Sequence, residues 1–143
     1  MENYQFKEFT IEFYDEAYSL WDNLEGISLS QADSPEGIKT FLIRNPGLSF
    51  VALDNNKLIG TVLCGHDGRR GYLHHLAVDK SYQRQGIGRK LAEASLNALH
   101  KSGIQKCHLF VVSENYQAQK FWERIGWIKR DDIIIMSFNI AGK

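Results

Sequence analysis

The chain has 143 residues, 43% of them hydrophobic and 24% charged, and its 17 basic and 17 acidic residues give a formal net charge of zero. This length predicts one domain over residues 1–143 with one buried core, and the composition excludes disordered and fibrous classes. A neutral chain has no overall field for nucleic acid or an anionic membrane, so we expect neither partner, and any anion must be bound locally.

The cysteines and the N-terminus indicate the compartment. Cys64 and Cys107 each lie inside an apolar segment, which favours reduced core thiols over a disulfide framework or a metal site. The N-terminus has no basic region followed by an apolar run, and no stretch approaches the about 20 apolar residues that span a bilayer. We therefore expect a cytoplasmic protein with no metal.

The first 45 residues predict a strand followed by two helices. Residues 4–9 alternate as a strand does, and residues 15–24 place apolar side chains at helical spacing. Ser34 and Pro35 are typical of the N-cap and first position of a second helix, which the sequence Asn45-Pro46-Gly47 ends.

The middle of the chain changes to the period of strands. Residues 48–53 and 58–64 are short apolar segments, and the asparagines between them tolerate a tight turn. Residues 72–78 predict a third strand of the same meander. We expect the centre of the sheet here.

The remaining segments alternate between helix and strand. Residues 88–102 predict an amphipathic helix that ends at Gly103, followed by a buried strand at 107–112 and a helix at 115–125. Residues 127–130 and 133–140 predict a terminal pair of strands. The predicted order is β-α-α-β-β-β-α-β-α-β-β, an α+β pattern with helices on the sheet faces.

One segment joins an apolar strand, a polar loop with two glycines and the start of a helix, and it extends from Leu76 to Arg89. Backbone N–H groups at a helix start carry partial positive charge, and Gly86 and Gly88 let the backbone approach a pyrophosphate without a Cβ clash. Arg84 and Arg89 would add charge-assisted hydrogen bonds. The segment predicts a local phosphate site.

Two better-known phosphate motifs do not fit this segment. A Rossmann fingerprint needs a third glycine where Leu91 stands, and it needs a βαβ unit where the sequence predicts hairpins. A P-loop needs Gly-Lys-Ser/Thr, which is missing. The pair of glycines alone would also suit a turn or close helix packing.

At this point the sequence resembles the GNAT superfamily of N-acetyltransferases. Its signature Q/R-x-x-G-x-G/A matches Gln83, Gly86 and Gly88, and residues 115–127 follow its pattern N-x-x-A-x-x-F-Y-x-x-x-G-F. The resemblance covers most of the chain from about residue 49, while residues 26–44 and 64–71 look like a bacterial subgroup of small GNAT proteins. It implies a mixed, mostly antiparallel sheet of six to seven strands with helices on both faces.

The resemblance also implies acetyl-CoA as cosubstrate, bound without a metal. Its pantetheine arm would pair with backbone groups in a splayed opening between the strands at 72–78 and 107–112. The contacts carried over from the family are Leu76, Ala77 and Val78 for pantetheine, then Gln83, Arg84, Gln85, Gly86, Ile87, Gly88 and Arg89 for the pyrophosphate, and Asn115, Phe121 and Trp122 farther along.

Amine acetylation needs a base for the amine proton and an acid for the leaving thiolate. His74 and His75 are the candidates for base or substrate contact, and as neighbours on a strand we expect them on opposite faces, so that only one faces the acetyl group. Many family members have a tyrosine where Trp122 stands, and an indole N–H cannot release a proton at these pH values. Tyr72 is a further candidate acid.

The acceptor would be a primary amine of a small molecule or of a protein N-terminus, attacked directly in a ternary complex. We expect its site near residues 24–33, 65–70 and Asp131, where Asp33 and Asp67 would attract a cation. Since dimers are common in the family, a homodimer is compatible with the sequence. The main rival is a catalytically weak acyl-CoA-binding regulatory module, favoured by Trp122, and a purely structural interaction domain is the third reading.

Overall fold

The computed structural model describes residues 3–141. These residues belong to two compact units, one ending at Phe110 and the other beginning at Val111. The single domain predicted from chain length stays a prediction.

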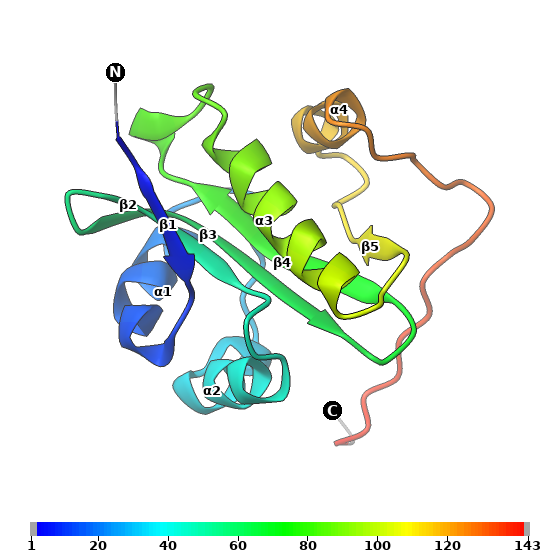
Figure 1. The fold of residues 1–143 in the computed structure, drawn as a ribbon. Coiled ribbons are helices and arrows are strands. Elements are labelled where there is room, and N and C mark those ends of the chain that lie inside the picture. The colour runs from blue at the N-terminus through cyan, green and yellow to red at the C-terminus, as the bar shows by residue number, and fades with distance from the viewer. Residues whose placement is uncertain (1–2, 142–143) are drawn as a thin grey trace. The chain divides into compact units, whose positions relative to one another are not determined.

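The first unit is built on a five-stranded sheet in the order β1-β2-β3-β4-β5 (Figure 1). The strands are β1 (Gln5–Glu8), β2 (Phe50–Asp54), β3 (Lys57–His66), β4 (Gly71–Val78) and β5 (Cys107–Leu109). The first four pair antiparallel with their neighbours, whereas β5 is parallel to β4. The predicted meander is therefore the centre of the sheet.

Helices cover both faces of this sheet. Helices α1 (Tyr14–Asp22) and α2 (Pro35–Arg44) lie on one face, and α3 (Ile87–Lys101) crosses the other (Figure 1). Short 3-10 turns precede α1, α2 and α3, and they are η1 (Ile11–Phe13), η2 (Gln31–Asp33) and η3 (Lys80–Tyr82). The α+β class with helices on both faces is confirmed.

Each face of the sheet has its own packing. Phe9, Trp21 and Ile38 belong to a buried cluster on the side of α1 and α2. On the opposite side, α3 approaches β4 so closely that a Cβ added to Gly71 would lie 2.6 Å from Cδ1 of Leu99. A side chain there would displace Leu99, so glycine allows the helix to pack closely on the strand.

Local patterns in the sequence predicted several element ends correctly. The Ser34 hydroxyl accepts a hydrogen bond from the amide of Gly37 at 3.0 Å and caps α2, with Pro35 at its first position. The turn between β2 and β3 has Asn55 at φ 48° and Asn56 at φ 68°, the left-handed values that asparagine tolerates.

The second unit departs from the prediction. Helix α4 (Tyr116–Arg124) forms as expected, but residues 127–141 form no strand in the described part of this unit. A strand needs a partner for its backbone groups, and here side chains of strand-forming type lie in solvent, with Ile134 83% and Phe138 88% exposed. The predicted terminal strands and the total of six to seven are wrong for this structure.

Strand β5 is also shorter than predicted, because it ends at Leu109 and not at residue 112.

No helix within residues 3–141 is long and apolar enough to cross a membrane.

Candidate active site

Strand β4 contains a bulge at His75 and Leu76, two of the residues predicted to belong to the active site. Its register with β3 pairs Ala77 with Thr61 but His74 with Leu63, so His75 and Leu76 together stand opposite Val62. His75 has a φ of 49°, a left-handed value that is uncommon for a residue other than glycine. The bulge therefore bends the strand and changes which side chains face α1 and α2.

Because of this bulge, the two histidines do not point to opposite faces. The His74 ring lies 6.1 Å from the ring of Phe41 in α2, and the His75 ring lies 4.8 Å from the ring of Trp21 in α1. Both imidazoles thus contact the layer formed by α1 and α2. The expectation from regular strand alternation is wrong here, since the extra residue shifts the side-chain period by one.

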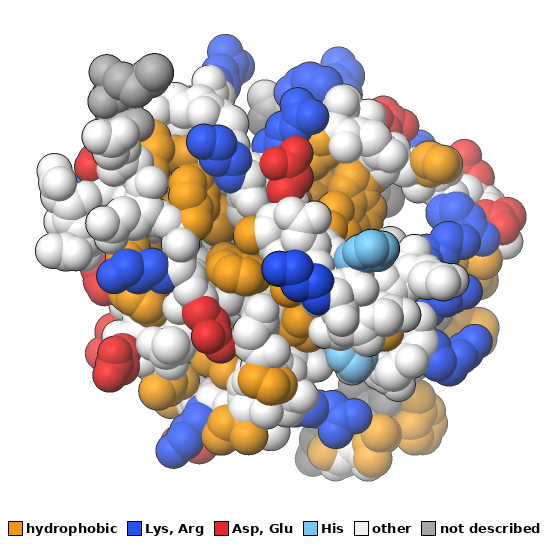
Figure 2. Space-filling model, viewed as in Figure 1, with side chains coloured by type: hydrophobic (Ala, Val, Ile, Leu, Met, Phe, Trp, Pro, Cys, Tyr) orange, Lys and Arg blue, Asp and Glu red, His pale blue; other side chains and the backbone are white. Residues whose placement is uncertain are grey.

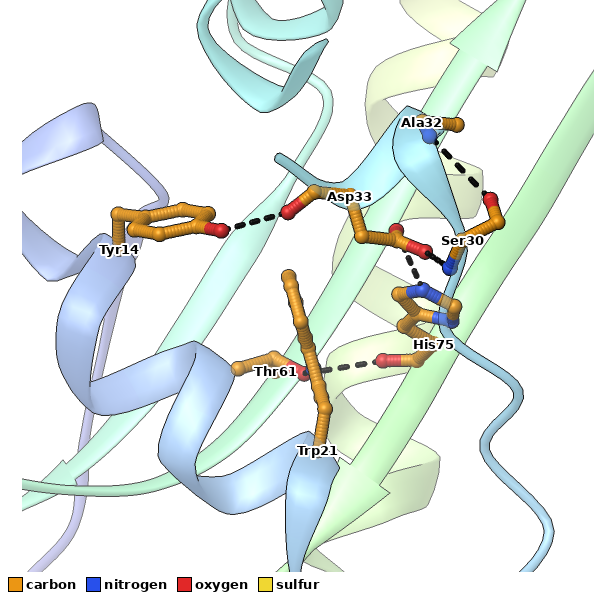
Figure 3. A network of polar contacts seen from close by, with 7 residues as sticks. All are labelled: Tyr14, Trp21, Ser30, Ala32, Asp33, Thr61 and His75. Atoms are coloured by element: carbon orange, nitrogen blue, oxygen red, sulfur yellow. Dashed lines mark hydrogen bonds and ion pairs between the residues drawn. The ribbon is translucent and has the colours of Figure 1, made fainter. Parts of the chain in front are cut away.

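His75 is held by a carboxylate. Its Nε2 lies 2.8 Å from Oδ1 of Asp33, and the two side chains are 15% and 9% exposed. The other oxygen, Oδ2, accepts a hydrogen bond from the amide of Ser30 at 2.9 Å, and the Asp33 carbonyl accepts one from the Tyr14 hydroxyl at 2.6 Å (Figure 3). Asp33 is thus fully engaged inside the protein.

The backbone of His75 is held as well. The Thr61 hydroxyl donates to the His75 carbonyl at 2.9 Å and accepts from Nε1–H of the fully buried Trp21 at 2.8 Å (Figure 3). These two hydrogen bonds connect α1 to β4 through Thr61 of β3. The left-handed residue is therefore anchored by its ring and by its carbonyl.

His74 has a different environment. No side-chain hydrogen bond joins it to another of the described residues, and its ring lies between Phe41 and the ring of Phe110, which is 6.4 Å away. Burial, followed by the neighbouring charge of His75, lowers the pKa of His74 below its usual 6.5, while Asp33 opposes the shift. His74 is therefore neutral at pH 7 and able to accept a proton.

Tyr72 lies next to this histidine on the same strand. Its ring is 6.3 Å from Phe110 and 5.9 Å from His108 of β5. The structure brings two of the three predicted catalytic candidates, Tyr72 and His74, against one aromatic residue. The phenol of Tyr72 can donate or accept a proton at this position.

The edge of β4 opens beside this cluster. Parallel pairing with β5 covers Gly71 to Leu73 and stops, although β4 continues to Val78. The backbone of Leu76, Ala77 and Val78 therefore follows the ladder without a partner strand on that side. A strand edge without a partner strand can accept an extended ligand.

The glycine loop continues from the open edge. Gln83 donates a hydrogen bond from Nε2 to the Val78 carbonyl at 2.9 Å, and the Tyr82 hydroxyl donates to Oδ2 of Asp54 at 2.7 Å. Arg84 and Gly86 take left-handed φ values of 66° and 83°. These bonds and dihedral angles turn the chain sharply into α3.

Helix α3 begins without a side-chain cap. Gly86 is its N-cap residue and supplies no side-chain hydrogen bond to the first turn. The amides of Ile87, Gly88 and Arg89 are therefore not satisfied by a cap, and they carry the partial positive charge of a helix start. They form a suitable cradle for a phosphate.

The charged groups around the loop are local. Arg89 donates from Nε to Glu93 at 3.1 Å on the exposed side of α3. Figure 2 shows basic, acidic and apolar side chains interspersed over the viewed face, as expected for zero net charge.

A pocket next to the loop is lined by Asn3, Tyr4, Phe6, Gln85, Ile87 and Lys90.

The remaining predicted contacts belong to the second unit. Asn115 caps α4, because its Oδ1 accepts a hydrogen bond from the amide of Ala118 at 3.1 Å. The Trp122 ring packs edge-on against Phe121 and Trp127, with ring centroids 5.0 Å apart in each pair. The family pattern N-x-x-A is thus a helix cap here, and Trp122 is part of an aromatic stack.

Two acidic residues expected to attract a cationic acceptor have other partners. Asp33 binds His75 and Ser30, as described above. Asp67 accepts hydrogen bonds from the amides of Arg69 and Arg70 at 2.8 Å each, and these bonds, that of Arg70 first, lower its pKa. Both carboxylates therefore organise loops.

Sequence reasoning missed the pair of Asp33 and His75 and the bulge that presents it. One signal was readable, because Ser30 and Asp33 have the spacing of a capping box, and the structure contains that box. Asp33 and His75 are 42 positions apart, and no local pattern in the sequence indicates that they are in contact. Among residues 3–141, no group of three or more metal-binding side chains comes together.

Comparisons with known proteins agree with this geometry. The model of a family described as "Acetyltransferase (GNAT) family" matches residues 6–127. N-alpha-acetyltransferase 30 of Schizosaccharomyces pombe is 39% identical over 106 residues, which are 71% of this chain and 71% of that protein. N-alpha-acetyltransferase 30 of Homo sapiens is 30% identical over 106 residues, which are 71% of this chain but 29% of that longer protein.

Solved structures give the same result for the fold. A chain of the NatC complex bound to Gag peptide and CoA has a TM-score of 0.78 and 26% identity, with 91% of this chain and 87% of that chain covered. PaiA N-acetyltransferase from Thermoplasma acidophilum, in complex with coenzyme A, has a TM-score of 0.78 at 19% identity, with coverage of 90% and 92%. At that identity the second likeness concerns the fold alone.

Proposed function

The chain belongs to the GNAT family of acetyltransferases, and from this premise we propose that it transfers the acetyl group of acetyl-CoA to the α-amine of a polypeptide N-terminus. The observation that carries the proposal is the open edge of β4 leading directly into the uncapped start of α3. The edge of β4 offers backbone without a partner strand to an extended arm, and the start of α3 offers amides to phosphates. The relatives named N-alpha-acetyltransferase 30 favour an α-amine acceptor.

The donor groups of the chain fit acetyl-CoA. Amides from Arg84 to Arg89 would hold its pyrophosphate, and the backbone of Leu76, Ala77 and Val78 would hold its pantetheine arm. Acetyl-CoA supplies a thioester, which is already reactive toward amines. The protein's contribution is then to orient the acetyl group and to donate a backbone hydrogen bond to the carbonyl oxygen as its negative charge develops.

His74 is the proposed base. It is neutral at pH 7, makes no competing hydrogen bond to the described residues, and lies where the β4–β5 ladder ends. Its imidazole would take the proton from the attacking amine, directly or through water. The nearby Tyr72 hydroxyl is the proposed donor of the proton that the leaving thiolate needs.

His75 does not serve as the base in this proposal. Its Nε2 is directed at Asp33, and its ring is packed against Trp21. Asn115, Phe121 and Trp122 remain proposed cofactor contacts on the strength of the family pattern alone. A homodimer stays a prediction.

The direct test is an acceptor panel. Purified protein is given acetyl-CoA with short peptides of different first residues, with small amines such as polyamines and aminoglycosides, or with no acceptor, and thiol release is followed. The proposal expects release that depends on peptides with a free α-amine and is lost with N-acetylated versions of the same peptides. Release with small amines only would assign the other acceptor class.

The second candidate, a regulatory module that binds acyl-CoA, rests on Trp122 within its aromatic stack. That module would bind acetyl-CoA in calorimetry yet release thiol slowly and independently of any amine. Binding together with acceptor-dependent release would exclude it. No binding at all would contradict both candidates.

A further inference from the structure

Asp33 and His75 form a largely buried polar contact in the first unit that the proposed chemistry does not use. Both side chains are largely buried, and their 2.8 Å contact joins η2, in the loop before α2, to the bulge in β4. The pair is 42 positions apart in sequence, so it connects two segments that local structure would not hold together.

The carboxylate fixes the proton on the imidazole. An ionised carboxylate only accepts hydrogen bonds, so Nε2 of His75 must carry a proton to bind Asp33. Asp33 itself is fixed by the Ser30 amide and by the Tyr14 hydroxyl on its carbonyl. Asp33 is thus also held by residues other than His75.

The bulge needs such an anchor. His75 adopts a left-handed conformation at φ 49°, which costs a residue with a Cβ roughly 1 kcal/mol or more. Strain of this kind persists where surrounding contacts hold it. Three contacts do so here: Asp33 on the ring, Trp21 against the ring, and Thr61 on the carbonyl.

The two residues beside His75 are those to which the proposed function assigns the chemistry. His74 precedes it, and the backbone of Leu76 follows it at the open edge of β4. Rotation of the His75 backbone would therefore move the base and the unpaired backbone groups together. Misplacement by about 1 Å can cost on the order of a hundredfold in rate.

We propose that Asp33 and His75 are positioning residues, which hold the β4 bulge so that His74 and the Leu76 backbone face the acetyl group. This inference rests on the proposed function. It also assigns Asp33 a role other than binding a cationic acceptor, because both carboxylate oxygens and the carbonyl already have partners.

A matched pair of variants tests the contact. In His75→Gln the side-chain amide can still donate to Asp33 from a place close to that of Nε2, whereas His75→Met has similar length and no donor. The proposal expects His75→Gln to keep kcat within about threefold, and His75→Met to lose kcat at least tenfold. The Kd for coenzyme A should change less than kcat in both, because the amides of residues 84–89 hold the pyrophosphate and only the Leu76 end of the pantetheine site adjoins the pair.

The results discriminate among roles. Equal and large losses in both variants would show that the imidazole itself does chemistry and would overturn the proposal. The proposal would also be overturned if His75→Met had a lower melting temperature but an unchanged kcat, with kcat measured well below that melting temperature. The contact would then be purely structural.

An imidazole nitrogen NMR measurement tests the geometry without activity. In the unmodified protein we expect His75 protonated on Nε2. In Asp33→Asn, the amide oxygen accepts from Ser30 and its NH₂ faces Nε2, so we expect the proton to move to Nδ1. An unchanged tautomer would contradict the contact. If no amine is acetylated, the proposed function fails, while this measurement still decides whether the pair exists.

Discussion

Gln83 donates a hydrogen bond from Nε2 to the carbonyl oxygen of Val78 at 2.9 Å, which joins the first residue of the glycine loop to the last residue of β4. This bond connects the two halves of the candidate cofactor site. It also gives a physical reason for the first position of the family signature, which is glutamine or arginine. Either side chain can donate to that carbonyl.

Replacement of Gln83 should therefore loosen the loop. We expect Gln83→Met to weaken coenzyme A binding about tenfold, equivalent to about 1.4 kcal/mol, because a hydrogen bond that orders the loop is lost. Gln83→Arg should stay within about threefold of the unmodified protein. Calorimetric titration with coenzyme A measures both, and equal affinities for the Met and Arg variants would contradict this role.

A negative charge at Gly86 should abolish cofactor binding. The protein leaves open space around an added Cβ there, so the harm of Gly86→Glu comes from strain at φ 83° and from repulsion of phosphates. Gly68→Glu is a matched control, since Gly68 has a φ of 91° and open space but lies in the β3–β4 turn. We expect loss of coenzyme A binding at position 86 and retention at 68. Similar losses at both positions would point to general strain.

The lowered pKa of His74 predicts the pH dependence of activity. A base must be neutral, so kcat, which reports groups in the enzyme–substrate complex, should rise with pH along an acid limb centred below 6.5. A rate profile from pH 5 to 8 measures this. The limb should vanish in the residual activity of His74→Gln, and a midpoint above 6.5 would contradict the assignment.

The same pKa shift predicts an effect on stability. Folded His74 binds its proton less readily than unfolded His74, so the unfolded state holds more protons from the folded pKa up to about 6.5. The free energy of unfolding should therefore fall as pH is lowered through this window. Urea titrations at two pH values should show a smaller fall for His74→Gln.

Thr61 should be sensitive to loss of its hydroxyl. Thr61→Val would leave Nε1–H of Trp21 without its buried acceptor and the His75 carbonyl without its donor. We expect the free energy of unfolding to drop by about 2–3 kcal/mol in urea titrations. Thr61→Ser keeps the hydroxyl and should lose less. Equal losses for Val and Ser would show that the methyl group, and not the hydrogen bonds, is what matters.

The sequence predicted what local chemistry determines. Ser34 and Pro35 start α2, and asparagines turn the β2–β3 hairpin, because each acts on the backbone within a few residues. The glycine loop was recognisable for the same reason. These features also identified the family. Helix α3 begins at Ile87, one residue before the predicted start.

The predictions that failed concern residues whose structure depends on partners distant in sequence. Regular alternation placed His74 and His75 on opposite faces, but one extra residue in β4 put both on the side of α1 and α2. His75 in the bulge contacts Thr61 and Asp33, which no local pattern connects to it. The apolar segment at 133–140 likewise has the composition of a strand but no partner within the described residues.

The most direct test of the central claim is acetylation of a defined peptide with the unmodified protein and His74→Gln in parallel. Mass spectrometry locates the acetyl group, and calorimetry measures acetyl-CoA affinity in both proteins. We expect one acetyl group on the α-amine, a loss of kcat of at least about a hundredfold in His74→Gln, and equal affinity for acetyl-CoA. Full activity of His74→Gln, or no transfer to any peptide by the unmodified protein despite cofactor binding, would contradict the account.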